Sequence, residues 1–278
     1  MFRLRYLHSV RQAGFNGIAP LSSIAEAFER ICRTRVSQKA FQPSLTVPDA
    51  VLQRVIELAQ LAPSSFNMQP YKIIVIRSKE VKLGLSQAMI GGNISTVLNA
   101  PISIVFLADR IPSRLTRKMM DLELKHGTDP GYVSSLPAKV SFLIGPGVVS
   151  SKIRRLASHL LSPLKPAPQI HAHQNEIWSI KNTALFAQQF ILASTAYGLE
   201  TSPMEGYDEL RLKFQLNIPP EEYSVPLVLS LGYTSQEAKD AAPAEPVNIT
   251  KDNLPVKKRF SLHEVTFEDQ YGQLPQFA

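Results

Sequence analysis

One segment, residues 176–197, constrains the fold most strongly because it carries apolar side chains on almost every side. Its sequence, EIWSIKNTALFAQQFILASTAY, predicts a long helix that ends before Gly198. A helix of this kind needs cover on more than one side, because water-exposed apolar surface is unfavourable. We therefore expect this helix to be buried in a domain core or in an interface between subunits.

Three short apolar segments are typical of buried strands, at residues 72–76, 102–108 and 225–231. Longer, helix-rich stretches separate them, such as residues 48–59, where apolar side chains recur on one helix face. Few strands separated by many helices favour an α+β domain with one central sheet. No apolar run approaches the roughly 18 residues of a membrane-spanning helix, so we expect no membrane partner.

The N-terminal residues 1–22 contain three arginines and no acidic residue, and the first acid is Glu26. An acid-poor segment that mixes arginine with apolar residues and serine is typical of a mitochondrial transit peptide, and a disordered basic tail is the alternative. We expect residues 1–22 to be an N-terminal extension and residues 23–278 to form the folded domain. The predicted location is the mitochondrion, or the cytoplasm if the extension is not a transit peptide.

No familiar catalytic motif is present. The chain lacks the GxSxG, HExxH, CxxC, phosphate-loop and GxGxxG patterns. His171 and His173 have no nearby third ligand, so we expect no metal site. The net charge is +7, but the basic stretches contain few aromatic residues between their cations. We therefore expect no nucleic-acid partner. An enzyme of this composition would use an organic cofactor, with the protein supplying position and electrostatics.

Two basic clusters suit the binding of a terminal phosphate. In an extended segment Arg35, Ser37 and Lys39 project from the same face, which places a hydroxyl between two cations. The alternative for this segment is the solvated basic end of a helix. Lys257 and Arg259 provide two further cations near the C-terminus.

A turn rich in neutral polar groups, LAPSSFNMQP at residues 61–70, precedes the first predicted strand. Two prolines restrict its backbone, and it contains no acid, histidine or cysteine. We expect this turn to hydrogen-bond a ligand that brings its own chemistry, while Ser64 and Gln69 brace the turn itself.

Taken together, these segments resemble the nitroreductase family of FMN-dependent oxidoreductases over roughly residues 24–270. Five motifs occur in the family's order, and Trp178 opens the long helix that leads into the fourth. They are RVSQKAF at 35–41, APSSFNMQP at 62–70, Asn93, TSPMEGYD at 201–208 and KKR at 257–259.

The resemblance implies a nitroreductase-like fold, with a central mixed or antiparallel sheet surrounded by helices. It also implies a homodimer with a swapped C-terminal segment and with FMN at the subunit interface. The long apolar helix at 176–197 agrees with this assembly, because it needs a partner surface.

The family's phosphate-binding residues map onto Arg35, Ser37, Lys39, Lys257 and Arg259. Four of these five groups are cationic and would offset a phosphate dianion.

The family's flavin-contacting residues map onto the turn and the central part of the chain. The resemblance implies that Ser65 and Asn67 hydrogen-bond the flavin or its ribityl chain, and that Asn93 reaches the pyrimidine edge. The residues that would lie along the isoalloxazine ring are Pro203, Met204, Glu205 and Gly206. The backbone N–H groups of Glu205 and Gly206 would donate to flavin N5 and O4.

The implied reaction transfers hydride from NADH or NADPH through flavin N5 to a nitroaromatic or quinone acceptor. It requires no catalytic side chain, and Asn182 on the long helix would only support the site. The alternatives are reductive dehalogenation or flavin-derived biosynthesis on the same scaffold, or flavin binding without turnover. Dehalogenation of an amino acid would need an acidic lid residue, and residues 130–175 contain no acid. The positive charge there, with Arg154 and Arg155, either steers NAD(P)H or has no role.

Overall fold

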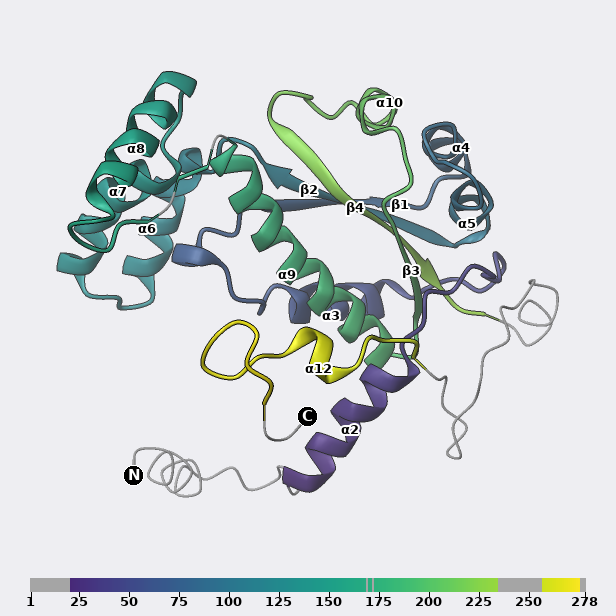
Figure 1. Ribbon diagram of the computed structural model, residues 1–278. Coiled ribbons are helices and arrows are strands. Elements are labelled where there is room, and N and C mark those ends of the chain that lie inside the picture. The colour runs from purple at the N-terminus through teal and green to yellow at the C-terminus, as the bar shows by residue number, and fades with distance from the viewer. Residues whose placement is uncertain (1–20, 169, 172, 235–256, 276–278) are drawn as a thin grey trace. The chain divides into compact units, whose positions relative to one another are not determined.

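A four-stranded antiparallel sheet lies at the centre of the fold (Figure 1). The computed structural model describes residues 21–168, 170–171, 173–234 and 257–275. The strand order is β1-β2-β4-β3, and the strands are β1 (Tyr71–Ile76), β2 (Ile102–Asp109), β3 (Glu200–Met204) and β4 (Tyr223–Gly232). β1 and β3 are therefore the two edge strands. The prediction of an α+β fold with one central sheet is confirmed.

The chain divides into two compact units. Residues 35–244 form one unit, which contains the sheet, and residues 1–34 and 245–278 form the other. The second unit includes α2 (Leu21–Thr34) and the short α12 (Leu262–Val265). The predicted extension, residues 1–22, lies almost wholly outside the described residues, and a single domain over 23–278 stays a prediction.

Helices cover both faces of the sheet (Figure 1). One face carries α3 (Asp49–Ala59) and α9 (Gln174–Ala196), and the other carries α4 (Lys79–Ser86), α5 (Asn93–Asn99) and α10 (Glu209–Gln215). In β2, Ile104 and Phe106 pack under α9, while Val105 and Leu107 belong to the core on the opposite face. Because both faces are covered, β2 has a continuous apolar sequence without polar alternation.

The long helix α9 is buried, as its sequence predicts. Phe186 and Phe190 both meet Phe106 of β2 edge-on, at ring-centroid distances of 5.9 and 5.7 Å. Phe186 also stacks on Tyr71, at 4.2 Å, where β1 begins. These aromatic contacts fix α9 against the sheet near the turn that precedes β1.

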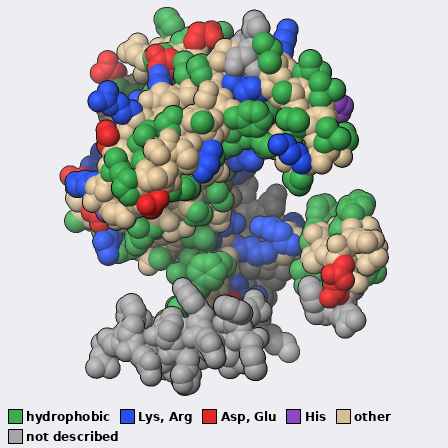
Figure 2. All heavy atoms as spheres, turned by 90° about the vertical axis from the view of Figure 1, so that its left-hand side faces the viewer, with side chains coloured by type: hydrophobic (Ala, Val, Ile, Leu, Met, Phe, Trp, Pro, Cys, Tyr) green, Lys and Arg blue, Asp and Glu red, His purple; other side chains and the backbone are tan. Residues whose placement is uncertain are grey.

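A separate group of helices lies at one end of the sheet and comprises η2 (Pro112–Leu115), α6 (Thr116–Lys125), α7 (Pro130–Ile144) and α8 (Val148–Leu161). α7 forms although its sequence contains two prolines and a glycine. The side chain of Asp129 caps α7, and Pro130 occupies its first position, where no N–H is needed. Figure 2 faces this end, where hydrophobic side chains interleave with Lys and Arg.

β3 is the strand that sequence reasoning missed. Its sequence, ETSPM, contains Pro203, which argues against a central strand but is compatible with an edge. None of the helices in the described part of the chain is long and apolar enough to cross a membrane.

Candidate functional site

The predicted phosphate-binding segment runs beside the start of β3. Ser37 forms a parallel bridge with Thr201, and the Gln38 N–H donates to the Thr201 carbonyl at 2.9 Å. Backbone pairing therefore holds the segment extended, which favours this alternative over the basic end of a helix. Ser37 and Lys39 are exposed, and Arg35 is half-buried.

Asn93 and Gly206 come together further along the same edge. The Asn93 amide donates through Nδ2 to the Gly206 carbonyl at 3.1 Å, and the Ile90 N–H donates to the same oxygen at 2.9 Å. A Cβ on residue 206 would lie only 2.8 Å from Asn93 Nδ2. Any larger residue at this position would therefore displace the Asn93 side chain.

The loop after β3 carries two adjacent free donors. In the part of the chain that the structure describes, the backbone N–H groups of Glu205 and Gly206 donate to no acceptor. Glu205 is exposed and Gly206 is half-buried, whereas Met204 just before them is 4% exposed. Neighbouring N–H groups on an anchored loop can bind an electronegative atom or a developing anion on a ligand.

The turn before β1 adopts an unusual backbone conformation. Phe66, Asn67 and Gln69 have φ angles of 57°, 52° and 49°, in the left-handed region that non-glycine residues rarely occupy. Such conformations cost on the order of 1–3 kcal/mol each and persist only where the surroundings impose them. The Gln69 N–H donates to Ser64 Oγ at 3.1 Å, which confirms that these two residues brace the turn.

Asn182 on α9 supports the turn through a hydrogen bond to its backbone. Its Oδ1 accepts from the Ser65 N–H at 2.8 Å, and its Nδ2 donates to the Trp178 carbonyl at 2.7 Å. Asn182 is 3% exposed, so both ends of its amide are satisfied in a buried environment. The exposed Ser65 side chain is thereby presented on a backbone that α9 holds in place.

The Asn67 side chain is engaged with α6. Its Nδ2 donates to Glu123 at 2.8 Å, and its Oδ1 accepts from Gln69 at 3.0 Å. The hydrogen bond from Thr128, followed by that from Asn67, lowers the pKa of the Glu123 carboxyl. An amide nitrogen has two N–H groups, so Asn67 retains one donor for a ligand.

The structure places the predicted site residues in separate groups. Asn93 and Gly206 lie at the β3 edge, whereas Ser65 and Asn67 precede β1 at the opposite edge. Three strand spacings separate the edges, which is roughly 14 Å. One chain therefore does not bring these residues together around a single ligand.

The other predicted cations belong to different surroundings. Lys257 is half-buried and Arg259 is exposed, and both belong to the smaller unit. Arg154 is 9% exposed and donates to the carbonyls of Gly145, at 2.9 Å, and Ser141, at 3.2 Å. It ties α8 to the end of α7, so it cannot steer an anion as predicted, whereas Arg155 is exposed.

Within the described ranges, no three His, Cys, Asp or Glu side chains group as metal ligands would. The chemistry of the site therefore rests on backbone donors, amides, hydroxyls and cations, which are groups that hold an organic cofactor.

A family model named Nitroreductase family matches residues 32–111 and 157–233. The chain belongs to the nitroreductase family. The match covers the phosphate segment, the turn, Asn93 and the loop after β3, and it leaves out residues 112–156. Asn182 and β3 therefore lie among the residues that match the family model.

Several curated bacterial proteins are similar to this family member. An NADH dehydrogenase of Thermus thermophilus is 25% identical over 191 residues, which are 69% of this chain and 79% of the relative. An oxygen-insensitive NAD(P)H nitroreductase of Salmonella typhimurium is 25% identical over 227 residues, 80% of this chain and 93% of the relative. Because these relatives are bacterial, they do not support the predicted mitochondrial location.

Solved structures share the fold. A putative nitroreductase from Exiguobacterium sibiricum, determined in complex with FMN, superposes with a TM-score of 0.63 at 19% identity and covers 87% of this chain and 97% of its own. A nitroreductase family protein from Streptococcus pneumoniae gives a TM-score of 0.64 at 21% identity, with coverage of 87% and 99%. These likenesses confirm the nitroreductase-like fold.

Proposed function

We propose that the protein is an NAD(P)H-dependent oxidoreductase that binds FMN along the β3 edge. The bound flavin supplies the redox chemistry, because it accepts hydride from NADH or NADPH at N5 and passes electrons to a nitroaromatic or quinone acceptor. The residues of this chain bind and orient the flavin and its partners.

The observation that carries this proposal is the pair of free N–H groups on Glu205 and Gly206. Asn93 and Ile90 anchor the Gly206 carbonyl, so the direction of the loop is set before a ligand arrives. Preorganised donors of this kind stabilise the charge that develops on a ligand without a reorganisation cost. They suit flavin N5 and O4 in type and arrangement.

The phosphate end of FMN is assigned to the segment beside the start of β3. Arg35, Ser37 and Lys39 alternate on an extended backbone that pairs with the strand carrying the free donors. A phosphate-binding role of Lys257 and Arg259, which the family resemblance implies, stays a prediction. Two or more cations and a hydroxyl are the groups that recognise a phosphate monoester.

We infer a homodimer in which the turn of one copy faces the β3 edge of the other. The opposite-edge arrangement of the two groups supports this inference, because one chain leaves the flavin site incomplete. Leu185 on α9 is 49% exposed, and Tyr271 in the C-terminal segment is 93% exposed. Burial of these two side chains against a partner subunit would be favourable, and it agrees with a swapped C-terminal segment.

The dimeric site can be tested by subunit complementation. Gly206→Ala damages the β3 side, and Asn67→Ala damages the turn. If both variants are co-expressed, mixed dimers contain one intact site, so FMN occupancy should recover to about a quarter of all sites. A site contained within one chain would show no recovery in the mixture.

The reaction is tested with the purified protein. Absorbance and mass spectrometry identify the bound cofactor, and anaerobic stopped-flow measures flavin bleaching by NADH and NADPH. Reoxidation by a quinone and by a nitroaromatic then identifies the acceptor class. Flavin that binds but is not bleached would favour the alternative of flavin binding without turnover.

A further inference from the structure

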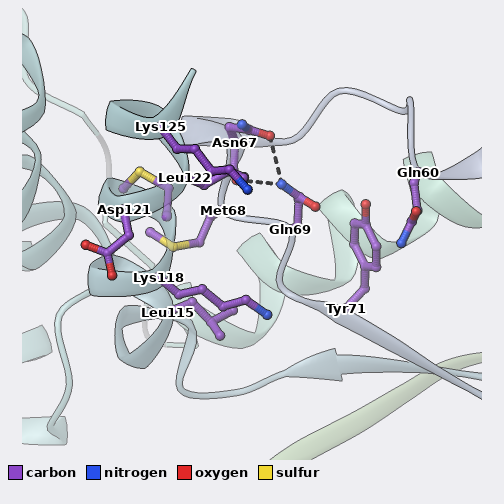
Figure 3. Close-up of a pocket in the computed structure, with 11 residues that line it drawn as sticks. Gln60, Asn67, Met68, Gln69, Tyr71, Leu115, Lys118, Asp121, Leu122 and Lys125 are labelled. Carbon is purple, nitrogen blue, oxygen red and sulfur yellow. Dashed lines mark hydrogen bonds between the residues drawn. The ribbon is translucent and has the colours of Figure 1, made fainter. Parts of the chain in front are cut away.

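A cavity of about 400 Å³ opens beside the turn, between α6 and the beginning of β1 (Figure 3). This volume lies in the range of roughly 300–1,000 Å³ that is typical of small-molecule sites. Met68 and Met119 contribute a buried apolar floor, each 3% exposed. Asn67 and Gln69 of the turn form the rim, together with Gln60 from the end of α3.

One face of α6 supplies the cations of this cavity. Lys118 and Lys125 are seven residues apart, two turns of the helix, so they project from the same side together with Leu122. In Figure 3 both ammonium groups point to the side where Gln69 and Tyr71 lie. The carboxylate of Asp121, which also lines the cavity, points the other way.

These cations are not neutralised within the protein. In the part of the chain that the structure describes, neither Lys118 nor Lys125 forms an ion pair. The hydroxyl of Tyr71 is buried beside the cavity and has no hydrogen-bond partner there. Two free ammonium groups, side-chain amides and apolar walls suit a ligand with a phosphate and a flat organic part.

The position of α6 is fixed at both ends. At its start, Arg114 donates to the buried Asp109 at 2.8 Å and to the Tyr223 hydroxyl at 2.8 Å. Near its end, Glu123 accepts from Asn67. The two lysines therefore stand on a rigid element that is tied both to the sheet and to the turn.

Part of the cavity wall lies outside the residues that the family model matches. Lys118 and Lys125 fall within residues 112–156, which the family model leaves unmatched. The turn on the other side of the cavity lies within the matched part. The cavity thus joins the turn, which the family model matches, to a segment that the model leaves unmatched.

We propose that this cavity binds the phosphate-bearing ADP half of NAD(P)H, a proposal that rests on the function proposed above. The nicotinamide ring must lie against the flavin to transfer hydride, and Asn67 belongs both to the proposed flavin site and to the cavity rim. The rest of the dinucleotide then extends along α6, where Lys118 and Lys125 bind its phosphates. This segment is thereby the specificity element for the electron donor.

The test compares three hydride donors on two variants. In the Lys118→Gln/Lys125→Gln protein, the KM for NADH or NADPH should rise about threefold for each lysine, because each contact is an exposed ion pair. Flavin reduction by 1-benzyl-1,4-dihydronicotinamide, which has no phosphate, should keep its wild-type rate. Arg117→Gln is the matched control, since Arg117 is exposed on α6 but does not line the cavity. Unchanged KM values for both dinucleotides would overturn the proposal.

A binding measurement separates this proposal from the proposed function. Titration calorimetry with ADP-ribose, which has the pyrophosphate and lacks the nicotinamide, should show binding to the wild type and weaker binding to the double-lysine variant. Equal affinity for both proteins, or no binding to the wild type, would contradict the cavity assignment even if the flavin is reduced. Absence of flavin reduction by all three donors would instead count against the proposed function.

Discussion

Gly206→Ala tests the central element of the candidate site. The added Cβ would lie 2.8 Å from Asn93 Nδ2, closer than real Cβ contacts allow. The Asn93 amide must then move and give up its 3.1 Å hydrogen bond to the Gly206 carbonyl. The loop that directs the two free N–H groups therefore loses one of its two anchors.

The size of the effect follows from the interactions involved. Each of the two misdirected N–H groups weakens a hydrogen bond to the flavin that is worth about 1 kcal/mol. Together they predict a loss of about 1–2 kcal/mol in FMN binding, or roughly a 5- to 30-fold rise in Kd. The free energy of unfolding of the apoprotein should fall by only about 1 kcal/mol.

Fluorescence titration of the apoprotein with FMN measures the affinity, and urea denaturation measures the stability. Gly92→Ala is the control, because a Cβ at Gly92 meets nothing within 4 Å and its φ of −64° suits alanine. It should leave both quantities near their wild-type values. If Gly206→Ala binds FMN as tightly as Gly92→Ala does, the assignment of these N–H groups to the flavin is wrong.

Three further predictions concern the elements that hold the turn and the core. Asn182→Ala leaves a partly buried backbone N–H of the turn unpaired and should destabilise the fold by about 1–3 kcal/mol in urea denaturation; an unchanged midpoint would refute the bracing role. Hydrogen bonds from Thr128 and Asn67 lower the pKa of Glu123, so the stability they provide is present above the unfolded-state pKa of about 4.3 and is lost as pH falls through the lower folded pKa. An NMR titration of Glu123 should show this depression, and Asn67→Ala should reduce it. Phe186→Ala removes a ring that is 2% exposed and should cost about 3–5 kcal/mol in the same denaturation assay, far more than Leu185→Ala on the exposed side of α9.

Local patterns were reliable where one physical requirement dominates. The continuous apolar run of β2 and the long apolar helix both have to be buried, and both are found close to their predicted bounds. In each case the sequence pattern leaves few alternatives for the backbone.

Local patterns failed where tertiary contacts override propensity. Helix α7 contains Gly131 and Pro137, residue types that usually break helices, and its contacts with Trp178 and Met68 stabilise it. The strand β3 is short and contains a proline, so only its place at the sheet edge makes it a strand. The burial of Arg154, which does not favour the steering alternative, has no signal in the net charge.

The sequence by itself determined the fold class, the family and the residue types that suit a flavin, because apolar periodicity and short polar motifs act locally. Only the tertiary structure decided how these motifs are distributed in space. It paired Asn93 with Gly206, left two N–H groups free, and placed the turn at the opposite sheet edge. It also turned Lys118 and Lys125 toward one cavity. These relations depend on strand order and helix packing, which join residues distant in the chain and leave no local signal.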